Sequence, residues 1–345
     1  RIDGTTGVAT VLYDGSGSGL AATSLHAAID ELADETITGP ASVADGLPSV
    51  FDGTTGRRIK AVTFAAFKTS LALAKADVGL GSVLNVPQRE KLTASRTYYV
   101  RTDGSDANDG LANSSGGAFL TIQKAIDTAA GLDLAIYSVT IQVGNGTYTQ
   151  GLSLKSFIGG GTITLRGDPT TPSNVVINPT AATCITADNV AGIWVVRGVK
   201  LIATTSGNGI LATGISNVLP YEVEFGSVGP SNYHMMATRG AVIYPQTNYA
   251  LSGGAYAHMF ADTGALIQNV NKTVTLSGTF AFSYFARAAH AATVQASGLT
   301  FAGTYTVTGP RYLGQFNGVI DVAGGGASYF PGDSAGSLAT GAQYA

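Results

Sequence analysis

The sequence has little charge, little sulfur and no long apolar run. Charged residues make up 12% of its 345 residues, about half of the ~25% found in ordinary globular proteins. The 19 basic and 22 acidic side chains give a net charge of −3, which excludes the basic surface of a nucleic-acid-binding protein. Because no apolar stretch approaches the ~18 residues that cross a bilayer, we expect no membrane insertion. A hydrophobic content of 45% argues against a disordered chain.

A single cysteine, Cys184, excludes an internal disulfide, so stability must come from the core, from assembly or from a metal. The sequence contains no phosphate-binding loop, no dinucleotide-binding glycine motif after a strand and no Ser-His-Asp motif, so we predict no cofactor. No secretory leader is recognisable near the start. Because the sequence begins at Arg1 rather than at methionine, we expect it to be a fragment or a processed product.

What the sequence does contain is glycine, 46 residues of it, together with a repeat. Glycine introduces a short β-favouring run at Gly240, Gly264 and Gly318, and a similar run lies at 291–294. The steps between these runs are about 24 to 27 residues, within the ~20–50 residues that are typical of solenoids. A second landmark, a five-residue pattern that ends in a small residue followed by glycine (YALSG, VTLSG and LTFAG), recurs at a constant step of 25 residues. Its three copies are residues 249–253, 274–278 and 299–303.

Short β-favouring runs bounded by Gly, Asn, Asp or Pro continue upstream, and residues 137–322 show no sustained helical period. The pattern predicts an all-β parallel solenoid of roughly eight coils, stacked at ~4.8 Å. No single coil buries its own apolar face, so several coils are required. A β-sandwich is the alternative, but that fold does not need a constant step along the chain.

A predicted helix precedes the repeats. Ile122, Ala125, Ile126 and Ala129 share one helical face, with Thr121 as N-cap and Gly131 as the stop. Such a helix would cover the open apolar end of the first coil. The strand, the Asp/Gly/Asn-rich loop and the helix "TIQKAID" resemble the entry to right-handed parallel β-helix proteins, which include phage tailspikes and pectate-lyase-like enzymes. The resemblance covers residues 97–322.

The Asp-rich loop that begins at Asp103 also suggests a calcium site. It departs from the EF-hand pattern, because Ala107 stands at position 5 and Ser114 at position 12. We favour a turn-rich loop whose Asp and Asn side chains cap the backbone, and we predict no metal.

Two short helical patches, at 25–32 and at about 63–74, lie within the first 95 residues. Each is too short to be stable alone, so we expect copies to pack together around a symmetry axis. The motifs "AAIDEL" and "LALAKADVGLGSVLNV" resemble the shaft and connector of tailed-phage fibres, although residues 85–89 replace the usual Asn/Asp-rich continuation. The end of the chain, "GGGASYFPGDSAGSLATGAQYA", resembles the Gly-rich terminus of prophage fibre proteins.

This resemblance implies a homotrimeric virion structural protein of the tail or another external appendage, which attaches non-enzymatically to a glycan or protein of the host surface. It implies four regions. They are an anchoring and shaft region at 1–95 that contacts other tail or baseplate proteins, the β-helix entry at 96–136, the β-helix at 137–322 and a Gly-rich tail at 323–345. The alternatives are a tailspike depolymerase, a glycosidase or lyase acting on surface polysaccharide, and a bacterial adhesin.

The depolymerase alternative depends on Glu222 and Glu224. Two residues apart on a predicted strand, they would share a face about 6.6 Å apart, a separation compatible with a glycosidase pair. Two solvated glutamates on an outward face are the simpler interpretation. The clustered Asp ligands that a calcium-dependent lyase needs are not visible in the sequence.

Histidines and tyrosines are the remaining candidates. His234 and His258 are one repeat apart and should stack on neighbouring coils, either as a metal pair or, as we favour, as a side-chain ladder continued by Phe285. Trp194 lies in an apolar run and should be core. A tyrosine combines an apolar ring with a polar tip that suits sugar or protein surfaces. We therefore predict receptor contacts at Tyr233, Tyr244, Tyr256 and Tyr284.

Overall fold

The structure, a computed structural model, describes residues 49–52, 58–61, 63–71 and 89–345. The chain divides between residues 87 and 88 into two units. In the first, β1 (Ser49–Asp52) and β2 (Arg58–Ala61) form an antiparallel pair that no sequence pattern indicated. The helix α2 (Phe64–Leu71) falls within the patch predicted at 63–74. The patch at 25–32 and nearly all of the fibre-like segment at 71–86 lie outside the described residues.

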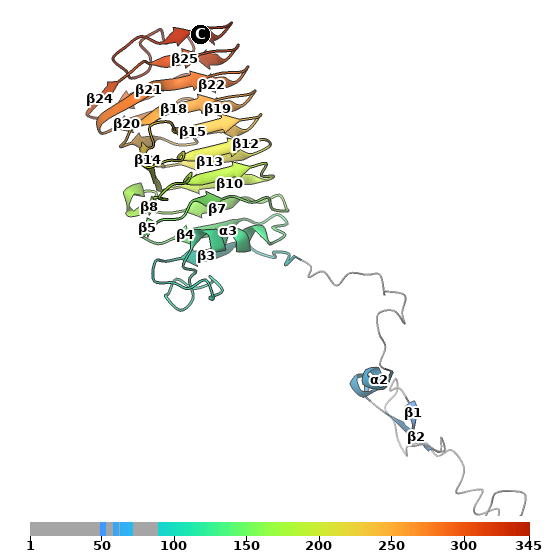
Figure 1. Ribbon diagram of the computed structural model, residues 1–345. Helices are drawn as coiled ribbons and strands as arrows, with labels where there is room; N and C mark the ends of the chain where they lie inside the picture. Colours follow the sequence, from blue (N-terminus) through green and yellow to red (C-terminus); the bar gives the residue numbers. More distant parts are fainter. Residues whose placement is uncertain (1–48, 53–57, 62, 72–88) are drawn as a thin grey trace, which may run out of the picture. The chain divides into compact units, whose positions relative to one another are not determined.

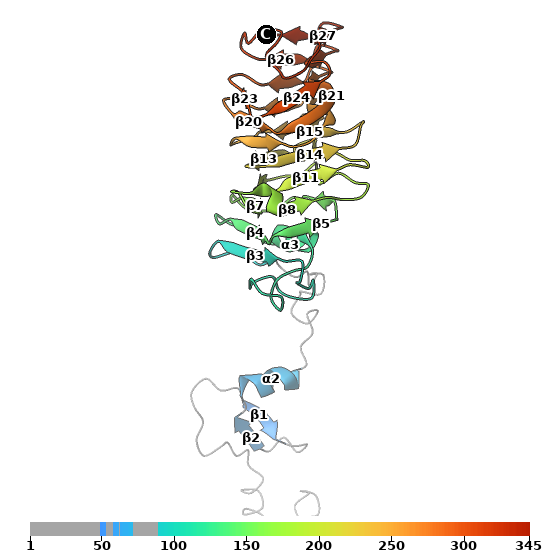
Figure 2. The same cartoon turned by 90° about the vertical axis from the view of Figure 1, so that its left-hand side faces the viewer.

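Within residues 89–345 three sheets run along a stack of coils, and every strand pairing there is parallel (Figures 1 and 2). The ten-stranded sheet contains β3 (Arg96–Val100), β4 (Val139–Val143), β7 (Ile163–Arg166), β10 (Ile193–Arg197), β13 (Asn217–Tyr221), β16 (Val242–Ile243), β19 (Leu266–Gln268), β22 (Thr293–Gln295), β26 (Val319–Asp321) and β28 (Gln343–Tyr344). The seven-stranded sheet contains β5 (Gly146–Tyr148), β8 (Val175–Ile177), β11 (Lys200–Ala203), β14 (Glu224–Val228), β17 (Tyr249–Leu251), β20 (Thr273–Leu276) and β23 (Thr300–Ala302). The nine-stranded sheet contains β6 (Leu152–Ser153), β9 (Ile185–Asp188), β12 (Ile210–Thr213), β15 (Tyr233–Thr238), β18 (Ala255–Ala261), β21 (Gly278–Ala288), β24 (Tyr305–Thr308), β25 (Tyr312–Gly314) and β27 (Ser337–Leu338).

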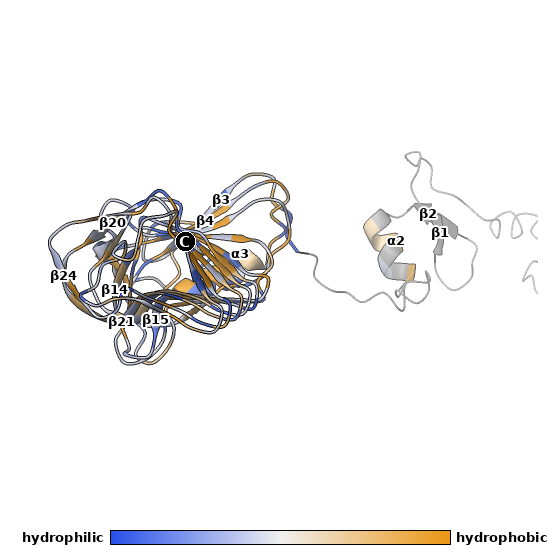
Figure 3. Cartoon of the chain, turned by 90° about the horizontal axis from the view of Figure 1, so that it is seen from above, coloured by the Kyte–Doolittle hydropathy of each residue, from blue (hydrophilic) through white to orange (hydrophobic). Residues whose placement is uncertain are grey.

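The coils from β4 to β23 each contribute one strand to each sheet, as β10, β11 and β12 do, whereas the coils at the two ends lack a strand in the seven-stranded sheet. The predicted all-β parallel β-helix is confirmed. A short 3-10 helix (Pro172–Asn174) precedes β8. Figure 3, which looks along the stack, shows successive coils overlying one another. None of the helices in the described ranges has the length and hydropathy that a bilayer crossing requires.

The core is a set of apolar columns that run from coil to coil. One column of the ten-stranded sheet pairs in register across seven coils and is completely buried. Its members are Ile163, Trp194, Val218, Ile243, Ile267, Val294 and Ile320. Every second side chain of a strand points to the same side of the sheet. When successive coils have similar lengths, inward-facing residues of one coil therefore lie on inward-facing residues of the next. The core position of Trp194 is confirmed.

The predicted stacking of the Gly240 and Gly264 neighbourhoods is also confirmed, because Val242 pairs with Leu266. Both glycines have a positive φ, 83° and 67°, at the tight turns that lead from the nine-stranded into the ten-stranded sheet. Glycine adopts this backbone conformation without steric cost, which explains why the landmark repeats.

The second landmark of the repeat needs one correction. Tyr249 pairs with Val274 as predicted, but Val274 pairs with Phe301, not with Leu299. The last of these coils is thus two residues longer. An insertion of two residues keeps every side chain on the same face of the strand, because side chains alternate with a period of two. The apolar pattern therefore looks unchanged in the sequence, and the greater length of this coil is not visible in it.

A helix covers the first coil, and a buried aromatic residue packs among the last coils. The helix α3 (Ile122–Ala130) buries the predicted face of Ile122, Ala125, Ile126 and Ala129, and the Thr121 side chain accepts a hydrogen bond from the Lys124 amide. At the other end Phe330 is 1% exposed and stacks on Phe285, with ring centroids 5.7 Å apart. The parallel ladders continue through β27 and β28 to residue 344.

Candidate functional site

Three of the four predicted tyrosines lie on successive coils of the nine-stranded sheet, in β15, β18 and β21 (Figure 1). The ring of Tyr256 makes edge-to-face contacts with those of Tyr233 and Tyr284, at centroid distances of 5.7 and 5.9 Å. All three side chains are half-buried, so each offers part of its ring to solvent. We call Tyr233, Tyr256 and Tyr284 the tyrosine ladder.

An aromatic ring and a cation extend the ladder. The ring of Phe260 lies 4.7 Å from that of Tyr233, and the Arg287 guanidinium lies 4.5 Å from the Phe260 ring centroid. Arg287 Nη1 donates to the Tyr233 hydroxyl at 3.4 Å, while its Nε has no partner among the residues the structure describes. Burial raises the pKa of Tyr233, which keeps its hydroxyl protonated. The sequence did not indicate Phe260 or Arg287, because their register depends on the longer coil of β21.

A groove of about 480 Å³ adjoins the ladder at the start of β18 and β21. Ala255 and Ser283, which line it, directly precede Tyr256 and Tyr284. Gly254 lets the coils approach here, because a Cβ at this position would lie 2.6 Å from the Ala281 carbonyl oxygen. The residues that line the groove, all in the described part of the chain, are uncharged. Ladder and groove together form a long surface of aromatic rings, hydroxyls and one cation, which suits an extended ligand of the sugar type.

Tyr244, the fourth predicted tyrosine, does not join the ladder. It follows β16, in the ten-stranded sheet, whereas the ladder lies on the nine-stranded sheet. Its side chain is half-buried, and its carbonyl oxygen accepts a hydrogen bond from Gln246 at 3.2 Å. The tight turn at Arg239 and Gly240, where both residues have a positive φ, separates the two sheets between β15 and β16.

Glu222 and Glu224 do not share a strand, and the sequence expectation on this point was wrong. The coil bends between β13 and β14, where Glu222 has a φ of 42°. Glu222 accepts from Arg197 Nε at 2.8 Å, and Glu224 forms an ion pair with Lys200 at 2.6 Å. Each carboxylate therefore pairs with a basic side chain of the preceding coil. These pairs link neighbouring coils.

His234 and His258 stack as the sequence predicted, fully buried inside the β-helix. Their Nδ1 atoms are 3.2 Å apart, and the ring of His258 lies 5.2 Å from that of Phe285 in the next coil. The sequence did not indicate two further members of this cluster. The Tyr249 hydroxyl lies 2.7 Å from His258 Nε2, and Asn269 Nδ2 donates to that hydroxyl at 2.7 Å. One signal could have indicated Tyr249. It pairs with Val274 on the next coil, so a residue with a polar hydroxyl stands in an otherwise apolar column.

This buried cluster is a hydrogen-bonded chain. With the Asn269 amide donating to Tyr249, the tyrosine hydroxyl donates to His258 Nε2, and His258 Nδ1 donates to His234 Nδ1. The two Nδ1 atoms share one proton in a hydrogen bond. They therefore do not offer two free lone pairs to a common metal ion. Burial lowers the pKa of His234 to about 3 and that of His258 well below its usual value, so both rings are neutral. Across residues 49–52, 58–61, 63–71 and 89–345 no group of three His, Cys, Asp or Glu residues is arranged to hold a metal.

The Asp-rich loop uses its carboxylates as backbone caps, as we favoured. Asp106 accepts from the amides of Leu120 and Thr121 at 2.9 Å and from the Thr121 hydroxyl at 2.7 Å. Asp109 accepts from the Leu111 amide at 2.9 Å. Asp103 pairs with Arg101, which lowers the pKa of the Asp103 carboxyl through a side-chain hydrogen bond. The loop is thereby tied to the start of α3.

No protein-family model matches the chain, and no curated protein matches it in sequence. Among solved structures, pectin methylesterase from carrot is similar with a TM-score of 0.34 and 13% sequence identity. That match covers 72% of this chain and 88% of the carrot protein.

Proposed function

We propose that this chain is a non-enzymatic attachment protein that binds a surface glycan through the tyrosine ladder and its groove. The observation that carries the proposal is the alignment of three half-buried tyrosines along the axis of the stack, beside an uncharged groove. The stack itself is held by continuous apolar columns, so the rings keep their spacing without the ligand. A preformed aromatic surface binds an extended polymer with a small entropic cost.

We further infer that the glycan belongs to a host cell and that the protein is a tail fibre or tailspike of a tailed phage, exposed on the virion. This inference is supported by the fibre-like sequence motifs, and it includes a homotrimer anchored to other tail proteins through residues 1–95. Three copies on one shaft raise the effective concentration of weak sites. Light scattering tests the trimer, with an expected mass near three times 35.0 kDa. A stable monomer would contradict it.

Binding of purified capsular polysaccharide or lipopolysaccharide tests the glycan site. Removing one stacking ring by Tyr256→Ala or Tyr284→Ala should weaken binding about tenfold. The matched control is Tyr99→Ala, a half-buried tyrosine of β3 in the first coil, which should bind like the unmodified protein. Equal affinity in all three variants would contradict the proposal.

The same incubation separates attachment from depolymerisation. A binding protein leaves the length of the polysaccharide unchanged over time. Shortened chains, with loss of the effect in Glu222→Gln or Glu224→Gln, would replace the proposal by a glycosidase or lyase. The ion pairs of both glutamates support a structural role instead, so we expect these variants to bind glycan normally.

A further inference from the structure

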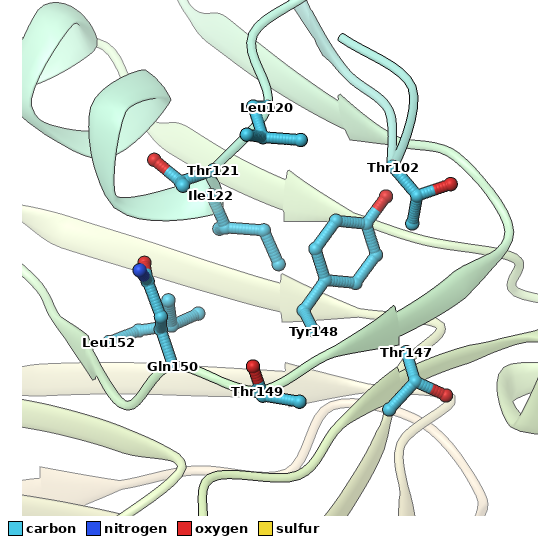
Figure 4. Close-up of a pocket in the computed structure, with 9 residues that line it drawn as sticks. All are labelled: Thr102, Leu120, Thr121, Ile122, Thr147, Tyr148, Thr149, Gln150 and Leu152. Carbon is cyan, nitrogen blue, oxygen red and sulfur yellow. The ribbon is translucent and has the colours of Figure 1, made fainter. Parts of the chain in front are cut away.

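A second pocket lies in the first coils, several coils before the tyrosine ladder. It has a volume of about 200 Å³ and opens between the start of α3, the residue Thr102 after β3, and the segment from β5 to β6 (Figure 4). The segment 147–152 and the residues 120–122 face each other across it. Thr102 and residues 120–122 belong to the predicted entry of the β-helix at 96–136, whereas residues 147–152 belong to the predicted β-helix at 137–322.

The floor of the pocket is apolar and rigid. Ile122 and Leu152 are each 2% exposed, and the Tyr148 ring stands between Ile122 and Thr102 in Figure 4. The Tyr148 hydroxyl donates to the Gly144 carbonyl oxygen at 2.9 Å, which fixes the ring. Burial raises the pKa of Tyr148 to about 12, so the hydroxyl remains a donor.

The rim consists of polar groups without internal partners. The side chains of Thr102, Thr147, Thr149 and Gln150 are exposed around the pocket, and none makes a hydrogen bond to any described residue. The Thr121 side chain differs, because it already accepts from the Lys124 amide and donates to Asp106. Three hydroxyls and one amide are thus available to a ligand over an apolar floor, the arrangement typical of small-molecule sites.

No free positive group among the described residues that line the pocket favours an anionic ligand. The α3 amino terminus would attract an anion, but the Asp106 carboxylate already binds the amides of Leu120 and Thr121. None of the lining residues, all of which the structure describes, carries a charge. The nearby Arg101 is paired with Asp103. The uncharged lining therefore favours an uncharged ligand that is rich in hydrogen-bonding groups.

We propose that this pocket binds a single uncharged sugar ring, such as a neutral hexose or the end of a glycan chain. Its volume lies below the roughly 300 Å³ at which sites for drug-sized ligands begin, so the pocket holds one ring at a time. The C–H faces of the sugar would pack on Tyr148, Ile122 and Leu152, while its hydroxyls bond to the rim. This site is independent of the tyrosine ladder and goes beyond the function proposed above.

Saturation-transfer NMR with the methyl glycosides of glucose, galactose, mannose and N-acetylglucosamine tests the pocket. The unmodified protein should transfer saturation to at least one glycoside. Thr102→Val and Thr149→Val keep the side-chain shape, remove one hydroxyl each, and should weaken that glycoside's affinity about three- to tenfold. Both positions are exposed, so the variants should fold.

Thr164→Val is the matched control, because Thr164 is a half-buried threonine of β7 outside the pocket and should leave the affinity unchanged. No transfer to any glycoside, or an affinity that survives the Thr102→Val/Thr149→Val double substitution, would overturn the proposal. Tyr256→Ala distinguishes this site from the ladder, since it should weaken polysaccharide binding without changing the methyl glycoside signal. Loss of the glycoside signal in Tyr256→Ala would also place that sugar at the ladder and overturn the pocket assignment.

Discussion

Acidification below pH 6.5 should destabilise this protein, because His234 and His258 are buried as neutral rings. In the unfolded chain an imidazole has a pKa of 6.5, while burial lowers the pKa of His234 to about 3 in the folded state. Below pH 6.5 the unfolded chain therefore binds a proton that the folded chain excludes, and stability falls as the pH falls. The loss begins near pH 6.5 and continues toward pH 3.

The magnitude follows from the same values. At pH 5, roughly 1.5 units below 6.5, the exclusion of one proton costs about 2 kcal/mol at ~1.36 kcal/mol per unit. The pKa of His258 is also lowered well below its usual value by burial, so its exclusion of a proton adds to this loss. Such a loss is a large fraction of the ~5–15 kcal/mol that stabilises a typical domain.

Denaturant unfolding at pH 7.5 and pH 5 measures this loss, and Trp194, the one tryptophan of the chain, reports it by fluorescence from the core. His234→Asn keeps an acceptor for His258 and removes one titrating ring, so its loss at pH 5 should be about half as large. His234→Phe/His258→Phe continues the column of Phe285 and should abolish the pH effect. A loss under about 1 kcal/mol in the unmodified protein, or an equal loss in the double variant, would refute the reasoning.

Three further predictions concern the stack and its cap. Ile243→Ala should cost about 2–5 kcal/mol in denaturant unfolding because it opens a cavity in a buried column, whereas Val242→Ala on the outer face should cost under about 1 kcal/mol; equal losses would argue against the inward column. Gly253→Ala should prevent stable folding, since its Cβ would collide with the Ser227 amide. Gly264→Ala has open space around its Cβ and should lower the stability by only about 1 kcal/mol through its positive φ. Thermal melts followed by circular dichroism compare the two variants, and equal melting temperatures would contradict the close approach at Gly253. Asp106→Ala should cost about 1–2 kcal/mol by releasing the two amides at the start of α3, and unchanged amide hydrogen exchange at Leu120 and Thr121 would show that the cap is dispensable.

The candidate site was predictable only where it follows the repeat length. The stacking of His234 on His258 follows from the nearly constant step of the repeat. The ring contacts of Tyr256 do not, because Ala257 is the residue that pairs with both Tyr233 and Tyr284. Tyr249 reaches His258 from the seven-stranded sheet, and Asn269, which follows β19, donates to the Tyr249 hydroxyl. No spacing along the chain indicates these contacts across the interior. Arg287 reaches Phe260 only because the coil of β21 is longer than those before it.

The amino-acid sequence by itself determined that this chain forms stacked parallel coils, that Trp194 lies in the core and that α3 covers the first coil. These features depend on local periodicity, since side chains alternate along a strand and equal steps return to the same face. Only the tertiary structure decided where each coil bends. The bend at Glu222 separates two glutamates that a continuous strand would have paired, and the turn at Arg239 places Tyr244 on a different sheet from the ladder. At these bends Glu222 and Arg239 have a positive φ, which non-glycine residues rarely adopt. Packing against neighbouring coils stabilises this backbone conformation, and the local sequence does not predict it.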